Sequence, residues 1–391
     1  MPPATSPGGN VSAEKSGSAE WEALIACARP GVDGAKFANL FANVDWPALL
    51  ALAEKHGVTQ RFAAATQTLP ETMVPAEIRA ALAERQRGQT FFTLRMSAEL
   101  FRLTERFAAQ NIAMLVVKGP ALAAQAYGDV SMRNYGDLDL LVRHEDIARA
   151  TQLMSDAGYQ AQIPLRAIAA NKIPGQYAFR QREANLLVEI HNERTMRYYP
   201  RPLPTEKIFA RSVRTEIDGR EIPAPCVEDH LVIICVHGAK HFWARLMWIA
   251  DVAALLSRHP ELRWRRAEQA AEEVGGETML HGGLLLAAQV LQAPVPEAVL
   301  ARADAAAQRL SKQVLQWLPA ASEAPPGLLA RALYRVRMSG GGANGAKYFM
   351  RLLFSPTEED WDASADEPRS FADVLKRPFR LAKKHRSAGK N

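Results

Sequence analysis

Cysteine is scarce in this 391-residue sequence, which contains only Cys27, Cys226 and Cys235. Their unrelated spacings favour neither a disulfide framework nor a zinc site. Proteins in the reducing cytoplasm rarely depend on disulfides, so the sequence fits a cytoplasmic protein best.

Long apolar runs are also missing. No run reaches the roughly eighteen apolar residues of a membrane helix, so we expect no membrane span. The N-terminal segment lacks both the basic start and the apolar core of a secretory signal. Residues 1–18 are rich in Pro, Gly, Ser and Ala, and we expect them to be disordered.

Charge is nearly balanced except at one end of the chain. The 48 Lys and Arg residues exceed the 42 Asp and Glu residues by only 6. Between Lys376 and Lys390, however, there are seven basic residues and no acid. This segment could contact nucleic acid or an anionic surface, or it could be a solvated tail. Phe379 is its one aromatic residue, which argues against single-strand binding through stacked bases.

The most informative stretch of the sequence runs from Ala113 to Val142, AMLVVKGPALAAQAYGDVSMRNYGDLDLLV. At its end, Asp137 and Asp139 alternate with apolar residues, a pattern typical of a half-buried strand. The two acids would then share a face, with Cα atoms roughly 6.6 Å apart. Two such carboxylates repel each other unless a cation lies between them, and Mg²⁺ is the usual one. Solvated acids at a strand end are the alternative.

Phosphate-binding residues are expected just before these acids. The apolar run from Ile112 to Val117 predicts a strand, and Pro120 suits the first turn of a helix that continues to Tyr127. Lys118 and Gly119 would lie at the start of this helix, where free N–H groups favour an anion. Arg133, in the following loop, could bind triphosphate oxygens, or it could be solvated or paired with an acid.

These features, in this order and spacing, resemble the signature of an uncharacterised bacterial nucleotidyltransferase family within the DNA polymerase β-like nucleotidyltransferase superfamily. The matching positions are Lys118-Gly119, the apolar helix 121–126 with Tyr127, Arg133, and the segment 136–142. The wider superfamily usually has Gly-Ser after its first strand, where this chain has Lys118-Gly119-Pro120, so the mode of phosphate binding stays open.

The resemblance implies a third carboxylate from a neighbouring strand. Residues 177–180 and 186–191 are predicted to form a hairpin, and in the second strand Glu189 and His191 share one face. Glu189 is therefore the best candidate, both by resemblance and by pattern, because Glu183 would lie in the turn. We expect Asp137, Asp139 and Glu189 to be the catalytic and metal-binding residues, and His191 either to line the site or to be structural.

Two histidines at positions i and i+4, His237 and His241, would lie on one face of a later helix. The Glu of an HExxH zinc motif is absent, so zinc is not expected. Members of the family tend to carry His-x-x-Lys-His followed by Trp and Asp, here His237, Lys240, His241, Trp248 and Asp251. The resemblance implies that Lys240 and the histidines face phosphates or the acceptor. Alternatively, they form a polar stripe between domains, with Asp251 paired to Lys240 or an arginine.

The predicted fold class is α+β: a small mixed nucleotidyltransferase sheet with flanking helices, plus N-terminal and C-terminal helical regions. Helices are expected over 46–56, 75–110, 145–157, 278–291 and 296–318, with Thr205 capping a short helix and residues 339–344 forming a linker. The expected division is 1–18 disordered, 19–110 helical, 111–225 nucleotidyltransferase domain, 226–354 helical domain, and 355–391 a basic, weakly ordered tail.

The resemblance implies a Mg²⁺- or Mn²⁺-dependent nucleotidyltransferase that moves the NMP group of an NTP to an acceptor. Nothing in the sequence identifies that acceptor, and support for a nucleic-acid partner is weak. The alternatives are a non-catalytic nucleotide-binding or scaffold relative, and a toxin-like modifier of RNA or protein.

Overall fold

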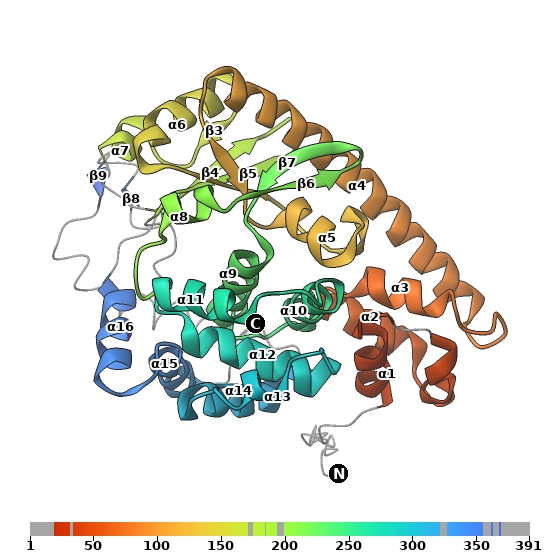
Figure 1. Ribbon diagram of the computed structural model, residues 1–391. Helices are drawn as coiled ribbons and strands as arrows, with labels where there is room; N and C mark the ends of the chain where they lie inside the picture. The colour runs from red at the N-terminus through yellow and green to blue at the C-terminus, as the bar shows by residue number, and fades with distance from the viewer. Residues whose placement is uncertain are drawn as a thin grey trace, which may run out of the picture.

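The computed structural model of the chain describes residues 19–31, 34–170, 175–183, 185–193, 199–320, 327–354, 361–362 and 367–368. Figure 1 shows a small sheet with its helices on one side of the molecule and two groups of helices, from the beginning and the end of the chain, on the other. The expected α+β class, a mixed sheet with flanking helices, is confirmed.

Among the N-terminal helices, α2 (Trp46–His56) is capped at both ends. In α2, the Asp45 side chain accepts a hydrogen bond from the Ala48 N–H at 3.0 Å, and Gly57 ends the helix in the left-handed conformation. The 34-residue α4 then passes from this group to the back of the sheet (Figure 1). The elements are α1 (Ala19–Ala28), the 3-10 helix η1 (Gly34–Phe41), α2 (Trp46–His56), α3 (Thr59–Thr66) and α4 (Ala76–Ala109).

The central sheet has five strands in the order β1-β2-β5-β4-β3. β2 and β5 are parallel, whereas the other neighbours are antiparallel, so the sheet is mixed. Its strands are β1 (Met114–Val116), β2 (Leu138–Val142), β3 (Gln160–Ala161), β4 (Gln176–Gln181) and β5 (Leu186–His191). The elements between them are α5 (Gly119–Tyr127), η2 (Val130–Met132), η3 (His144–Asp146), α6 (Ile147–Asp156) and α7 (Leu165–Ala169).

The two faces of the sheet pack against different cores. Leu138 and Leu140 of β2, with Val188 of β5, belong to an apolar cluster that includes the buried stripe of α4. Leu115 and Leu141 belong to a larger cluster shared with the N-terminal and C-terminal helices. Because side chains alternate along a strand, Asp139 lies on the same face as Leu141, toward this second cluster. The acidic face of the sheet is therefore covered by the helical parts of the chain.

The C-terminal part is mostly helical. A hairpin precedes it, and the buried helices α9, α10 and α12 form its centre. The elements are α8 (Thr205–Ala210), β6 (Val213–Ile217), β7 (Arg220–Ala224), α9 (Val227–Lys240), α10 (Leu246–Arg258), α11 (Trp264–Val274), α12 (Glu277–Leu291), α13 (Glu297–Leu300), α14 (Ala305–Trp317), η4 (Leu318–Ala320), α15 (Leu328–Arg337), α16 (Gly342–Phe354), β8 (Trp361–Asp362) and β9 (Glu367–Pro368).

Several local predictions were wrong. The helix expected over 296–318 is two helices, because the Asp304 side chain accepts from the Ala307 N–H at 2.6 Å and starts α14 anew. Thr205 is the first residue of α8, not its cap, which is Pro204. The expected linker 339–344 is shorter, since α16 already begins at Gly342. The helix expected from residue 145 starts with the 3-10 turn η3.

Two predictions fall on parts of the chain outside the described residues: the disorder of 1–18 and, except for β8 and β9, the basic tail 355–391. Within the described part of the chain, no helix combines the length and apolar character that crossing a membrane requires.

Candidate active site

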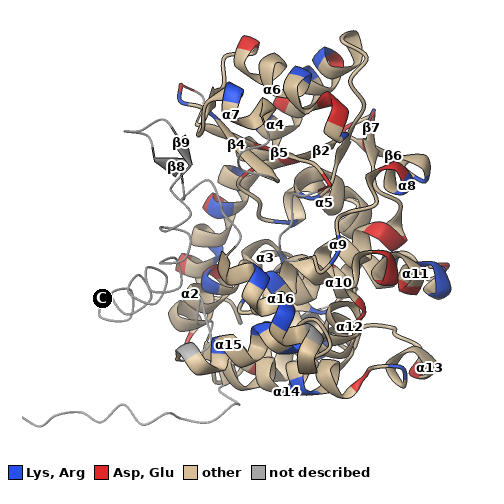
Figure 2. Cartoon of the chain, turned by 90° about the vertical axis from the view of Figure 1, so that its left-hand side faces the viewer, with Lys and Arg blue, Asp and Glu red and all other residues tan. Residues whose placement is uncertain are grey.

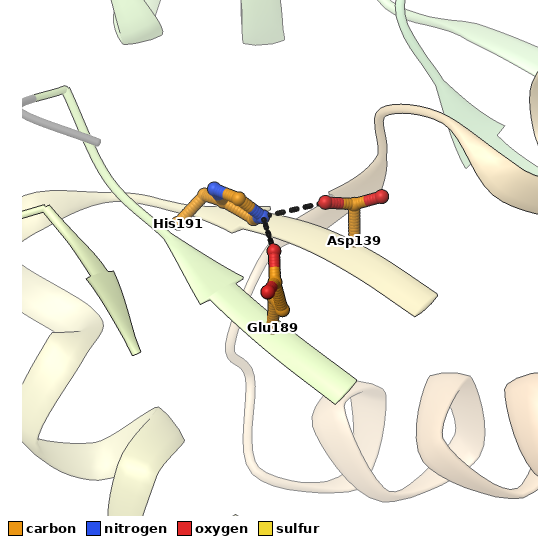
Figure 3. A group of neighbouring side chains, drawn as sticks. All are labelled: Asp139, Glu189 and His191. Carbon is orange, nitrogen blue, oxygen red and sulfur yellow. Dashed lines mark hydrogen bonds and ion pairs between the residues drawn. The ribbon is translucent and has the colours of Figure 1, made fainter. Parts of the chain in front are cut away.

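The two central strands place one acidic side chain from each next to the other. In the parallel register of β2 and β5, Asp139 lies opposite Glu189, and His191 follows on the same face. Figure 3 shows the three side chains converging, with His191 Nε2 2.8 Å from Asp139 Oδ1 and 3.5 Å from Glu189 Oε2. Their potential ligand atoms all lie within 4.8 Å of one another. One divalent cation could contact all three.

Lys118 joins this cluster from a third element. It follows β1 and precedes α5, and the adjacent Val117 N–H donates to the Asp139 carbonyl at 3.0 Å. The Lys118 Nζ lies 2.8 Å from Asp139 Oδ1, and the lysine side chain is only 10% exposed. A buried ammonium needs such a partner, because leaving water without one is costly. Lys118 is therefore part of the acidic cluster.

The electrostatics of the cluster are tightly linked. Burial alone would raise the pKa of Asp139, but Lys118 and the hydrogen bond from His191 hold that pKa well below its usual range. Burial alone would lower the pKa of His191, yet the bonds to Asp139 and Glu189 raise it. Asp139 is thus held as an anion by Lys118 and by the hydrogen bond from His191.

Asp137 lies immediately before β2 and is half-buried. Burial and the neighbouring Asp139 raise the pKa of Asp137 to about 6. It is not one of the three residues whose ligand atoms lie within 4.8 Å of one another. Its carboxylate nevertheless interacts with Asp139 and Glu189, so negative charge is in excess at this point and a cation would relieve it.

Gly119 occupies a position that only glycine fills without strain. Its φ is +52°, and a Cβ there would lie 3.2 Å from the carbonyl oxygen of Asp137. The close approach brings the first turn of α5 against the residue that precedes β2. The start of α5 and the acids therefore form one continuous site.

Arg133 does not point to solvent. Its Nε donates to both carboxylate oxygens of Asp251 on α10, at 3.1 and 3.0 Å, and the two side chains are 7% and 2% exposed. The Tyr127 hydroxyl donates to the same carboxylate at 2.8 Å. The structure therefore corresponds to the acid-paired alternative for Arg133 and links the sheet domain to α10.

The histidines of α9 lie near the site in a group of their own. The rings of His237 and His241 are 4.7 Å apart, and His241 stacks on Trp248 at 5.0 Å. Burial and then the charge of Lys118 lower the pKa of His237 well below its usual value. For His241, burial and then the charges of Lys240 and Lys118 lower the pKa to about 3. Both imidazoles are therefore neutral near pH 7, and the positive charge of Lys118 contributes to lowering both pKa values.

The turn after α9 holds these rings in place. Trp243 has a φ of +51°, and its N–H donates to the Gly238 carbonyl at 2.8 Å. A Cβ on Gly238 would come within 2.4 Å of the Trp243 ring, so the indole fits only because residue 238 is glycine.

One neighbour of the acids was not predicted from the sequence. Gln176 of β4 lies opposite His191 in the antiparallel register, and its side-chain amide donates to Glu189. The buried Tyr177 beside it is the signal that could have found this residue, because strand alternation then turns Gln176 toward the face of the acids.

The chain was compared with solved structures, curated proteins and protein-family models. One solved structure that resembles the chain is that of an antigenic nucleotidyltransferase-like protein from Paracoccidioides brasiliensis, with 16% identity and a TM-score of 0.32 over 51% of this chain and 94% of that chain. No curated protein matches. The family model described as "Uncharacterised nucleotidyltransferase" matches residues 42–292, from α2 through the sheet to the end of α12. The chain belongs to this uncharacterised nucleotidyltransferase family.

Proposed function

We propose that the protein is a Mg²⁺-dependent nucleotidyltransferase that transfers the NMP group of a nucleoside triphosphate to an acceptor and releases pyrophosphate. The observation that carries the proposal is the parallel pairing that sets Asp139 beside Glu189, with Lys118 at the adjoining helix start. Membership of the family supports the reaction class.

The residues fit a divalent cation. Asp137, Asp139 and Glu189 would supply carboxylate oxygens, the ligands that Mg²⁺ and Mn²⁺ prefer. The buried Nδ1 of His191 has no hydrogen-bond partner among the described residues, while its Nε2 faces the two acids. A divalent cation in such a site neutralises charge on the entering and leaving oxygens of a phosphoryl displacement.

Lys118 supplies positive charge to Asp139, and His191 Nε2 lies within hydrogen-bond distance of the same carboxylate. With a cation bound, the Lys118 ammonium would be released from Asp139 and could turn to the phosphates. The N–H of Gly119 lies at the start of α5, where the partial positive charge of the helix favours the same anion. These two residues would therefore hold the triphosphate next to the acids.

Glu189 would also orient the acceptor. Its carboxylate accepts from Gln176 and lies beside His191, so its position is fixed from two sides. A carboxylate held in this way can accept the proton of an attacking hydroxyl. The charge of Lys118 acts on His237 and His241. We propose that these histidines and Lys240 contact the phosphates or the acceptor.

Label transfer tests the reaction. The protein is incubated with each of four α-labelled nucleoside triphosphates, Mg²⁺ or Mn²⁺, and a cell extract that supplies acceptors. We expect labelled product with the wild-type protein and none with Asp137→Ala/Asp139→Ala. Equal transfer by both proteins would refute the assignment of the site. Nucleotide binding without transfer to any acceptor class would instead indicate a non-catalytic relative.

The basic residues of α15 and α16 give little support for nucleic acid as the acceptor. Figure 2 shows basic residues along α15 and α16. Three of them are used within the protein: Arg335 donates to the Lys240 carbonyl, Arg337 to the Gln313 side chain and Arg351 to the Tyr199 carbonyl. These guanidiniums make hydrogen bonds within the protein, so they are poor evidence for a nucleic-acid surface.

A further inference from the structure

A second polar cavity lies at the opposite end of α5 from the acids. Its volume is about 470 Å³, and it is bounded by the ends of α1, α5 and α10 and by α3. Lys118 precedes α5 and Tyr127 ends it, so at about 1.5 Å per residue the two ends are roughly 13 Å apart. The cavity is therefore distinct from the acidic cluster.

Among the described residues that line this cavity, three are arginines and none is an acid: Arg29, Arg61 and Arg258. Arg61 is the most enclosed of them, at 9% exposure, and its guanidinium lies 5.3 Å from the centre of the Tyr127 ring. One nitrogen of Arg61 donates to the Arg29 carbonyl at 2.6 Å. The buried Nε atoms of Arg61 and Arg29 have no hydrogen-bond partner within the described part of the chain.

The carboxylate of Asp251 is already engaged with other residues. Asp251 interacts electrostatically with Arg61, but its oxygens accept from Arg133 and Tyr127. Arg258, on the opposite rim, packs its guanidinium against Gly128, where a Cβ would lie 2.6 Å from it.

The carbonyls at the ends of α1, α5 and α10 explain part of this arrangement, because cations are favoured at helix C-termini. They do not account for all of it. A guanidinium carries five N–H donors, and Arg61 uses one of them on the Arg29 carbonyl. Buried cations are normally paired, because their desolvation is otherwise uncompensated.

We propose that this cavity is a binding site for a small molecule that carries a phosphate group. Guanidinium forks match phosphate oxygens in pairs, so three of them around one space suit a dianion. The volume is that of a small-molecule pocket, and apolar atoms of Ala64, Ala126 and Ala254 on its wall suit the organic part of a phosphate monoester. The proposal is independent of the reaction assigned to the acids.

Calorimetric titration of the full-length protein with inorganic phosphate and with glycerol 3-phosphate, both without divalent metal, tests the site. We expect one saturable site that weakens as salt is added. Arg258→Gln should weaken binding about tenfold or more, because each charge-assisted contact contributes at least that much. Arg61→Gln should do the same, and Arg309→Gln on the exposed face of α14 should bind like the wild type.

Arg61 is buried, so Arg61→Gln is informative only if the variant folds. Arg258 is exposed, and the phosphate affinity of Arg258→Gln therefore tests the site without this difficulty. Lys118→Met separates the two sites: it should leave phosphate affinity unchanged if the cavity binds the ligand. The proposal is overturned if no saturable binding occurs, if Arg258→Gln binds as tightly as the wild type, or if Lys118→Met abolishes binding. Tighter binding of glycerol 3-phosphate than of inorganic phosphate would indicate that the organic part is also recognised.

Discussion

Replacing Asp251 by Asn is the perturbation whose cost the structure defines most clearly. The Arg133 and Asp251 side chains are 7% and 2% exposed and are bonded through Arg133 Nε and both carboxylate oxygens. Removing one partner leaves the other charge buried and unpaired, which costs about 3 to 5 kcal/mol. We therefore expect the free energy of unfolding to fall by about this amount, without a change in the slope of the urea transition.

A double-mutant cycle separates this pair from its surroundings. Arg133→Met alone should also destabilise the protein, but Arg133→Met/Asp251→Asn should be more stable than the sum of the single changes predicts, by about 2 to 3 kcal/mol. Asp218→Asn, an exposed acid in the β6–β7 turn, is the matched control and should lie within about 0.5 kcal/mol of wild type. All four variants are compared by urea unfolding monitored by circular dichroism.

The result also decides what Arg133 does. If Asp251→Asn cost less than about 1 kcal/mol, or if the cycle were additive, the pair would not be the buried bridge described here. Arg133 would then be available to a triphosphate.

Three further predictions concern single residues. His56 is fully buried and accepts the Leu246 N–H at 3.0 Å, and burial lowers its pKa from 6.5 to about 4. The unfolded chain therefore binds the extra proton first, and stability falls as the pH drops from 6.5 toward 4. Between pH 7 and pH 5, unfolding free energies should show the wild type losing about 2 kcal/mol more than His56→Gln, and equal losses would contradict this. Gly119→Ala puts a Cβ 3.2 Å from the Asp137 carbonyl at a φ of +52°. It should cost about 1 to 2 kcal/mol in urea unfolding, and a neutral result would show that the turn relaxes freely. Lys118→Met removes a competitor for Asp139 and the proposed phosphate contact. In titrations it should raise metal affinity and weaken triphosphate binding about tenfold, whereas a fall in both affinities would contradict the exchange of partners.

The acidic strand was predictable because its signal is local. Alternation over residues 137–142 places Asp139 on one face without reference to any other part of the chain. The same holds for the hairpin strand of Glu189. What alternation cannot supply is the pairing: Asp139 and Glu189 are 50 residues apart, and only the parallel register sets one opposite the other.

Longer-range partners could not be derived from local pattern at all. Arg133 and Asp251 are separated by 118 positions. The residues around Arg133 are compatible with an acid partner and those around Asp251 with an arginine partner, but no local pattern joins the two. The break between α13 and α14 was missed for a different reason. Apolar periodicity continues across it, and the competing Asp304 cap decides where the second helix begins.

Calorimetric titration with a non-hydrolysable ATP analogue, with and without Mg²⁺, tests whether β2 and β5 form a metal–nucleotide site. We expect Mg²⁺ to tighten binding to the wild type and to Glu183→Gln, whose acid is exposed in the β4–β5 turn. Glu189→Gln should lose the Mg²⁺-dependent part of the affinity, because Glu189 lies beside Asp139 in the strand pair. If Mg²⁺ tightened binding to Glu189→Gln as much as to the wild type, these two strands would not form the metal–nucleotide site.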